Sequence, residues 1–442
     1  MTLHKWAPVL MLLTWSCTAV SEDFFEMTDA EPSRTGQEAE RNIEFSGALT
    51  HRLHYALTEQ SDQLPFRRED TGPASIRYDL LLESRYRLGD DITFQLAGLG
   101  SYDAELVDPS YIELHQSYIE WGATPSLNLK VGRQLVSLGE SNYFQIADRI
   151  NPIDERAFGL AELRETLLPV ASTRLSYYQS RWGLDLTAVH EFRPNQYDEP
   201  YGDFDPYIEL RALPLHIQEH RPDVSFTDPD LVGRLFWSRP WGDLAVFASQ
   251  IHSREARPLE AGSNDLVLGY SEITLLGASA NRVLGDWLLK SEYAYSDGDL
   301  YLVDHSHAVE TQGASALSVE GSEHQHMVGG RYSGMSNLTL DLELLGSRIG
   351  STEAPLGEEK TQLKGVASLE YQMLNEDLVA NLTYMGWTKN PASMVRFRLD
   401  YAFRDEIVLF IGAVNYRASS EDSMLAPYQN NDRIFTGFTL TF

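Results

Sequence analysis

The chain has 442 residues, and its 65 acidic and 35 basic side chains give a formal net charge of −30 at pH 7. A charge of this sign disfavours a nucleic-acid partner, because phosphate binding requires surplus cations. Hydrophobic residues make up 43% of the chain, but beyond its start no run approaches the roughly 20 apolar residues of a spanning helix. A bundle of membrane helices is thereby excluded, and the single cysteine excludes a disulfide framework.

Residues 1–21 have the pattern of a secretory signal peptide. Lys5 supplies the positive start, and residues 7–15 supply a short apolar core. Ala19 and Ser21 frame a cleavage site of small residues. We therefore expect export with cleavage near Ser21, and a mature chain without cysteine suits the envelope of a Gram-negative cell.

The only cysteine, Cys17, would leave with this signal peptide. The alternative is that Cys17 becomes the lipidated first residue of a lipoprotein, which Trp15 fits poorly. Residues 22–41 are polar and acidic without periodicity, which predicts a flexible segment before the folded part at 42–442.

From residue 42 to the end, short stretches alternate apolar and polar residues with a period of two, which is the pattern of β-strands. Tyr78, Leu80 and Leu82 share one strand face, for example. The opposite faces carry charges of both signs, as the wall of a water-filled lumen requires. The candidate lumen residues are Arg52, Arg77, Asp79, Glu83, Arg85, Arg396, Arg398 and Asp400.

The connections between these stretches alternate in length. Tight turns such as 89–91 and 404–406 are interleaved with long segments such as 138–170 and 193–231. This layout is typical of outer-membrane barrels, and it predicts about 18 strands with both termini on the periplasmic side. Because a bilayer leaves unpaired backbone groups without water, the sheet must close on itself. The predicted fold is therefore all-β, a transmembrane antiparallel up-and-down β-barrel.

Aromatic residues support the same fold. Tryptophans near the predicted strand ends indicate interfacial girdles. The last residue, Phe442, ends an alternating strand and resembles the C-terminal assembly signal of bacterial outer-membrane barrels. The candidate girdle residues are Trp121, Trp182, Trp237, Trp241, Trp287 and Trp387.

The segment 138–170, which follows the fifth predicted strand at 127–137, differs from the other loops because it has an apolar surface of its own. Phe158, Leu160 and Leu163 fall at helix-like spacing, with Asp154 as a candidate cap. We expect this loop to fold into the barrel and narrow it. The alternative is an extracellular cap packed on neighbouring loops.

Charged side chains in and beside this loop would set a transverse field at a constriction. The candidate constriction residues are Arg133, Glu140, Asp148, Arg149, Asp154 and Arg156.

The same region carries a family resemblance. The residues Val-Gly-Arg-Gln-Leu-Val-Ser-Leu-Gly-Glu-Ser, Ile-Asn-Pro-Ile-Asp and Leu-Arg-Glu-Thr-Leu-Leu-Pro-Val, within 129–172, resemble the pattern of the outer-membrane family called domain of unknown function 1302. Leu138 departs from it where tryptophan is expected. The resemblance implies a large outer-membrane β-barrel, sometimes linked with export of apolar or lipid-like molecules. The Gly-Arg-Gln strand is also similar to alginate-export channels, whose lumen is strongly basic, unlike the mixed lumen expected here.

Two constellations suggest other chemistry. His305, His307, His324 and His326 flank one long loop, where four imidazoles could meet around a metal, although polar loop histidines are the simpler interpretation. His51, His54 and Ser84 could be argued into a lipid hydrolase site, but no nucleophile motif accompanies them.

The sequence therefore predicts a passive outer-membrane channel with no catalytic residues, cofactor or metal. Its expected partners are outer-membrane lipid and a small or moderately sized solute that is not identified, with apolar or lipid-like compounds included. A homotrimer and a periplasmic export partner stay open. The alternative functions are an outer-membrane component of an export system for a lipid or polysaccharide, a membrane-embedded lipid hydrolase and a structural surface barrel.

Overall fold

The computed structural model describes residues 43–60, 64–161, 163–262, 264–304, 317–350, 352, 354–420 and 423–442. The predicted signal peptide, the segment 22–41 and the histidines His305 and His307 lie outside these residues.

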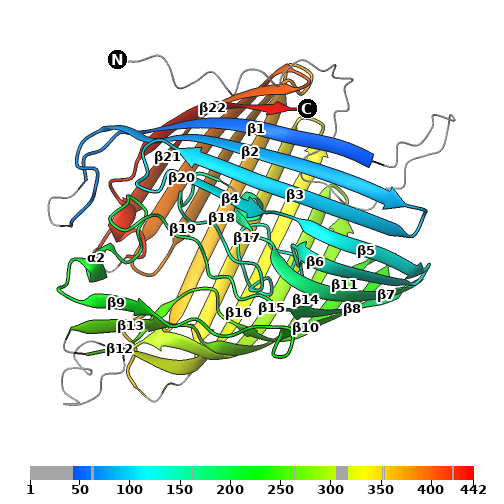
Figure 1. Cartoon of the computed structure of the whole chain (residues 1–442), viewed down its shortest axis with the longest axis horizontal. Coiled ribbons are helices and arrows are strands. Elements are labelled where there is room, and N and C mark those ends of the chain that lie inside the picture. Colours follow the sequence, from blue (N-terminus) through cyan, green and yellow to red (C-terminus); the bar gives the residue numbers. More distant parts are fainter. Residues whose placement is uncertain are drawn as a thin grey trace.

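One large antiparallel sheet dominates the structure (Figure 1). Its strands are β1 (Ile43–Ala56), β2 (Gly72–Leu88), β3 (Ile92–Asp103), β4 (Ser110–Leu114), β5 (Ser117–Thr124), β6 (Leu127–Gln134), β7 (Val170–Gln179), β8 (Trp182–Val189), β10 (Asp230–Arg239), β11 (Gly242–His252), β14 (Glu272–Leu284), β15 (Trp287–Leu302), β16 (Ser318–Met335), β17 (Leu338–Ile349), β18 (Thr361–Met373), β19 (Leu378–Trp387), β20 (Ala392–Arg404), β21 (Ile407–Ala418) and β22 (Arg433–Thr441).

The sheet closes into a barrel. The strands of this sheet pair in the order in which they follow one another, except that β4 and β5 do not pair with each other, and β22 pairs with β1, beside which it lies in Figure 1. Because β4 and β5 both pair with β3, they are two pieces of one interrupted strand, so the 19-stranded sheet is a barrel of 18 strands. The predicted fold class is confirmed. Phe442 completes the closure, because its backbone and that of Gly47 exchange hydrogen bonds of 2.8 and 3.0 Å.

Side chains alternate across the barrel wall as the sequence pattern predicts. On β17, Leu342 and Leu344 are 40% and 53% exposed, whereas the intervening Glu343 is 1% exposed. The apolar side chains thus face outward and the polar ones inward, the opposite of a soluble sheet protein, whose apolar face is buried.

The girdle prediction holds at one end of the barrel only. Trp121, Trp182 and Trp241 lie at the tight turns and are exposed. Trp387, however, is 9% exposed and packs inside the barrel at the other end of a strand. It follows Gly386 on the outer face, so strand alternation turns the Trp387 ring inward.

Outside the barrel wall, a small sheet is formed by β9 (His216–Glu219), β12 (Arg257–Ala261) and β13 (Asp265–Gly269). The helices are the single turns α1 (Leu163–Thr166), α2 (Ile208–Arg211) and the 3-10 turn η1 (Ala426–Tyr428). No helix in the described part of the chain is long and apolar enough to cross a membrane.

Gly132 on β6 holds a backbone conformation that favours glycine, with φ +135°. A Cβ atom there would meet the carbonyl oxygen of Ser117 and lie 2.6 Å from the Cα of Tyr118 on the paired strand. We expect Gly132→Ala to cost about 1–3 kcal/mol of backbone strain and to lower the fraction of folded, heat-modifiable barrel on a gel. Gly100→Ala is the matched control, since a Cβ atom there meets nothing within 4 Å. Equal folded fractions for the two variants would contradict the prediction.

Candidate functional site

The loop after β6, residues 135–169 and here called L3, lies against the inner wall of the barrel. Its residues Phe144, Ile146 and Ile150 are buried in one apolar cluster with Ile273 of β14 and Met327 of β16. These strand residues alternate with outward-facing neighbours, so they belong to the lumen face. L3 thus contributes an apolar surface that covers part of the inner wall.

Two buried carboxylates of the wall hold the tip of L3. Glu292 on β15 accepts hydrogen bonds from the backbone N–H groups of Glu140, at 2.7 Å, and Ala147, at 2.9 Å. Glu343 on β17 accepts from the hydroxyl of Ser141 at 2.6 Å. The N–H groups of this loop segment are therefore satisfied by the barrel wall, which fixes the path of L3 across strands far from it in sequence.

Most of the predicted constriction charges in L3 bind the loop backbone or the barrel wall, and so hold the loop in its conformation. The carboxylate of Asp148 accepts the N–H groups of Leu138 and of Gly139, the latter at 3.2 Å. Burial raises the pKa of Asp148, and those N–H groups oppose the shift. Arg149 pairs with Asp299 of β15 at 2.6 Å, so both charges are bound within the protein.

Glu140 lies closer to the tight-turn end of the barrel than Arg149 does. Its carboxylate accepts a hydrogen bond from the side chain of Asn281 at 3.0 Å. Asn281 lies near the tight turn between β14 and β15. The tip of L3 therefore extends well down the barrel.

The prediction of an amphipathic helix after Asp154 is wrong for most of the segment. Helix is limited to α1, and Gly159 has φ +78°, which no regular helix continues through. The carboxylate of Asp154 does not cap a helix, since it binds Arg156. The apolar residues Phe158 and Leu160 instead pack on the wall formed by β19–β22.

The described structure brings several predicted lumen residues together on β1, β2 and L3. Asp79 accepts from Arg52 at 3.0 Å and from Arg77 at 2.8 Å. The hydroxyl of Tyr111 on β4 lies 2.9 Å from Arg77 and 2.8 Å from Arg156 of L3. We call Arg52, Arg77, Asp79, Tyr111 and Arg156 the arginine–tyrosine network.

Asp154 joins this network through Arg156, whose guanidinium lies over the Tyr111 ring at 4.6 Å. Burial opposes ionisation of Asp154, but the hydrogen bonds and charge of Arg156 hold its pKa below the ordinary value. The three arginines face the carboxylates of Asp79 and Asp154, and the charge of Glu165 also acts on Arg52. The side chain of Arg52 is 38% exposed, against 17% for Arg77, so Arg52 is the guanidinium most available to a solute.

The neighbouring Glu155 has a different environment from Asp154. Burial, followed by the nearby charges of Glu255 and Asp154, raises the pKa of Glu155 to about 7. Its charge therefore changes within the physiological pH range.

The other predicted lumen residues lie outside the network. Arg398 pairs with Asp400 at 2.8 Å on β20, and Arg396 on the same strand is 4% exposed. Arg85 and Glu83 on β2 both bind Gln95 of β3.

Arg133 is the one predicted constriction residue that does not share this inner surface. It lies on the strand face of the exposed Val131 and pairs with Glu191 after β8. Its inclusion with the lumen residues followed from its closeness to L3 in sequence alone.

Sequence reasoning missed Tyr111, Glu292 and Glu343 as site residues. Tyr111 follows the segment 103–110, which the sequence pattern assigns to a connection between strands. Nothing in the local pattern identifies Tyr111 as a site residue. The two glutamates stand at the inward phase of regular strands, which is the one signal that identifies them. Their hydrogen bonds to the backbone of L3 join residues far apart in sequence, and a periodic pattern cannot predict such contacts.

The remaining candidates do not form a site in the described residues. His324 and His326 face outward and contact Tyr293 and Ser291. Among the described residues, no group of three or more metal-ligating side chains is arranged around a common point. The register places Ser84 opposite Phe45 and His51 opposite Tyr78, which separates the residues of the lipid hydrolase alternative.

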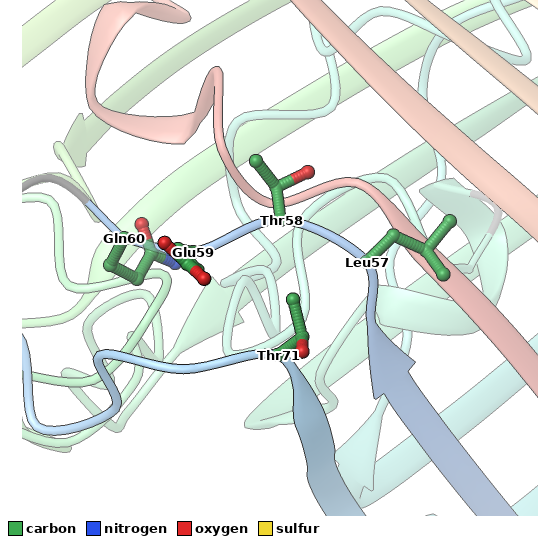
Figure 2. A pocket seen from close by; sticks show the side chains of 5 residues that line it. All are labelled: Leu57, Thr58, Glu59, Gln60 and Thr71. Carbon is green, nitrogen blue, oxygen red and sulfur yellow. The ribbon is translucent and has the colours of Figure 1, made fainter.

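A pocket lies at the loop that joins β1 and β2 (Figure 2). It is lined by Leu57, Thr58, Glu59, Gln60 and Thr71. It contains none of the arginine–tyrosine network.

The family model described as "Protein of unknown function (DUF1302)" matches residues 108–405, which is more than half of the chain. The chain belongs to the DUF1302 family. A search of curated proteins gave no match for this DUF1302 barrel.

Solved structures that share the fold of this DUF1302 chain include OccAB4, OccK2 and OpdK. OccAB4 of Acinetobacter baumannii has a TM-score of 0.54 at 12% identity, covering 91% of this chain and 99% of that one. OccK2 (OpdF) of Pseudomonas aeruginosa, solved with glucuronate, has a TM-score of 0.51 at 12% identity and covers 91% and 97%. OpdK of the same species, solved with vanillate, has a TM-score of 0.50 at 11% identity and covers 90% and 98%. OpdK is described as an outer membrane protein.

Glu292→Ala should release the tip of L3 in this DUF1302 barrel. Each buried N–H group that loses its acceptor costs about 1–3 kcal/mol. We therefore expect the variant to unfold at a lower temperature in detergent and L3 to become sensitive to protease. Glu370→Ala is the matched control, because the carboxylate of Glu370 on β18 accepts from Gln372 of the same strand at 3.2 Å. A Glu292→Ala protein as stable and as protease-resistant as this control would contradict the assigned role.

Proposed function

We propose that the chain is a passive outer-membrane channel for small solutes, with L3 and the arginine–tyrosine network as its selective part. Supporting the proposal, a closed barrel of this strand number encloses enough space for an aqueous lumen once its inner face is polar. The mechanism is diffusion, and the proposal requires no covalent step.

The observation that carries the proposal is the attachment of L3 to two separate parts of the wall. Residues 140–147 are held by Glu292 and Glu343, and Arg156 contacts Tyr111 of β4. A loop held at both places narrows the passage, and a solute would pass the partly exposed Arg52. Fixed cations of this kind favour anions over cations of the same size.

Removal of L3 tests the channel and its constriction together. Deleting residues 145–165 should raise the single-channel conductance of protein reconstituted in planar bilayers, because the deleted segment takes up cross-section inside the barrel. Barrel folding of the deletion variant is checked by heat-modifiable migration on a gel. A folded variant with unchanged conductance would contradict the constriction, and a native protein without conductance would contradict the channel itself.

The network predicts the direction of ion selectivity. Arg156→Gln should lower the anion-to-cation permeability ratio, because it removes one of the three guanidinium charges while the Asp79 and Asp154 carboxylates stay. Reversal potentials measured in a salt gradient give the ratio. Arg282→Gln removes the same charge from the exposed end of β14, where the residue pairs with the outward-facing Leu289, and should leave the ratio unchanged. The prediction fails if both variants shift the ratio equally.

A further inference from the structure

The barrel wall is shortest around β5 to β8. The strands β5, β6 and β8 have 8 residues each, whereas β15 and β16 have 16 and 18. At the loop end of this sector, β4 lies beside the last part of β3, and the next strands do not extend far enough to pair with it. Within the described residues, β4 has a strand partner on one edge only, which is β3.

The second edge of β4 presents backbone groups without a ladder. The N–H of His115 donates to Ala97 on β3, so the alternation of an antiparallel pair turns the backbone groups of Ile112 and Leu114 away from β3. The carbonyl of Leu114 is met by the side chain of Arg133 at 2.9 Å. A side chain thus stands where the next strand would be.

One ion pair, between Arg193 and Glu113, crosses this interruption together with the hydrogen bond from Arg133 to Leu114, and a second ion pair lies along its β6–β8 border. Arg133 of β6 pairs with Glu191, which also accepts the N–H of Ala171 at 3.1 Å. Arg193 pairs with Glu113 of β4 and donates to the carbonyl of Pro169 at 3.3 Å. Both Glu191 and Arg193 belong to the loop 190–229, here called L4. The wall is thus joined across the interruption by the side chains of Arg193 and Arg133 and not by a backbone ladder.

The interruption has a defined frame. At the turn side, β5 and β6 are paired again from Ser117 opposite Arg133. At the loop side, Glu199 of L4 accepts the N–H groups of Val107 and Asp108 at 3.0 and 2.9 Å. We call the framed area between β4 and the ends of β6–β8 the window.

Both borders of the window expose apolar side chains. On one border, Ile112 is 89% and Val107 73% exposed. On the other, Phe226 is 75% exposed and stacks on His190 at 4.0 Å, just after β8. These are three of the four large apolar side chains in the described residues that are more than 70% exposed, so the window concentrates the most exposed apolar groups of the molecule.

From the length of β3 we infer that the window lies near the loop-side surface of the membrane. A tilted spanning strand uses about 9–11 residues, and β4 pairs with the last part of β3, which is itself 12 residues long. Inside the window, Tyr111 of β4 belongs to the arginine–tyrosine network. The adjacent Ile112 is exposed on the other face of β4, so the network and the outer surface lie on opposite sides of this strand.

We propose that the window is a lateral passage, through which a solute with an apolar body and a polar end moves between the lumen and the outer leaflet. Open sheet edges are tolerated at membrane depth only beside protein or water, which a hydrated opening supplies. Ion pairs between side chains separate without breaking a backbone ladder. The polar end of the solute meets the network at Tyr111, and the apolar body meets Ile112 and Phe226. This inference rests on the proposed channel function and names its substrate class.

A reversible crosslink across the window tests the passage. Glu113→Cys and Arg193→Cys replace one ion pair in a chain whose only native cysteine is Cys17. In Gram-negative cells that make this double variant, a cleavable bifunctional thiol reagent should reduce uptake of the apolar dye N-phenylnaphthylamine severalfold. Reductant should restore uptake. Conductance of potassium chloride through the crosslinked protein in planar bilayers should stay unchanged, because ions follow the axis of the barrel.

The matched control is Ser291→Cys with His326→Cys. Their native side chains contact each other at 3.2 Å on the outer face, between β15 and β16, where the ladder is continuous. Crosslinking this pair should change neither dye uptake nor conductance. Heat-modifiable migration on a gel confirms that both variants fold.

Four results would overturn the passage. Dye uptake that is unaffected by the window crosslink excludes it, and so does an equal fall of dye uptake and conductance, which indicates a block of the axial lumen. An equal loss of uptake in the Ser291/His326 control excludes a role specific to the window. Cysteines at 113 and 193 that are protected in cells but reactive in detergent would show that another polypeptide covers the edge of β4. A native protein that takes up dye without conducting ions contradicts the channel and leaves the passage standing.

Discussion

The structure depends on one constraint, which is that backbone hydrogen bonds of a membrane-embedded sheet must be made within the sheet. Pairing between β1 and β22 removes the two edges that an open sheet would present, and at the remaining edge of β4 the side chain of Arg133 binds the backbone in place of a partner strand. Once the sheet is closed, alternation assigns each side chain to lipid or to lumen. The burial of Glu343 between the exposed Leu342 and Leu344 is one result of that assignment.

Closure also determines how charge can be used inside the barrel. Carboxylates such as Glu292 and Glu343 are inward because their neighbours are outward, and a buried carboxylate needs donors. The N–H groups of L3 are such donors, and L3 needs acceptors because it has almost no secondary structure of its own. The wall and the loop therefore satisfy each other, and the loop position follows from strand phase.

The barrel could be predicted from sequence because its two signals are local. Period-two alternation and the contrast between tight turns and long loops are both visible in a single chain, and they gave the strand number and the facing of Arg52, Arg77 and Asp79. The site was predicted less well because its contacts are long-range. The spacing of apolar residues around Phe158 and Leu160 suggested a helix. These residues instead pack on the barrel wall, and the local sequence pattern does not show that the wall lies beside them. Arg133 was assigned to the lumen from its neighbours in sequence, while its face is set by β-strand alternation.

The junction of Phe442 with Gly47 has a kinetic consequence. The ring of Phe442 lies against Gly47, so the first and last strands of the folded chain meet through residues almost 400 positions apart. Loop closure over that distance is slow, and until it occurs each terminal strand has an unpaired edge that can pair with another chain. The wall therefore cannot be sealed until β22 has been synthesised, and the edges of the two terminal strands stay free until then.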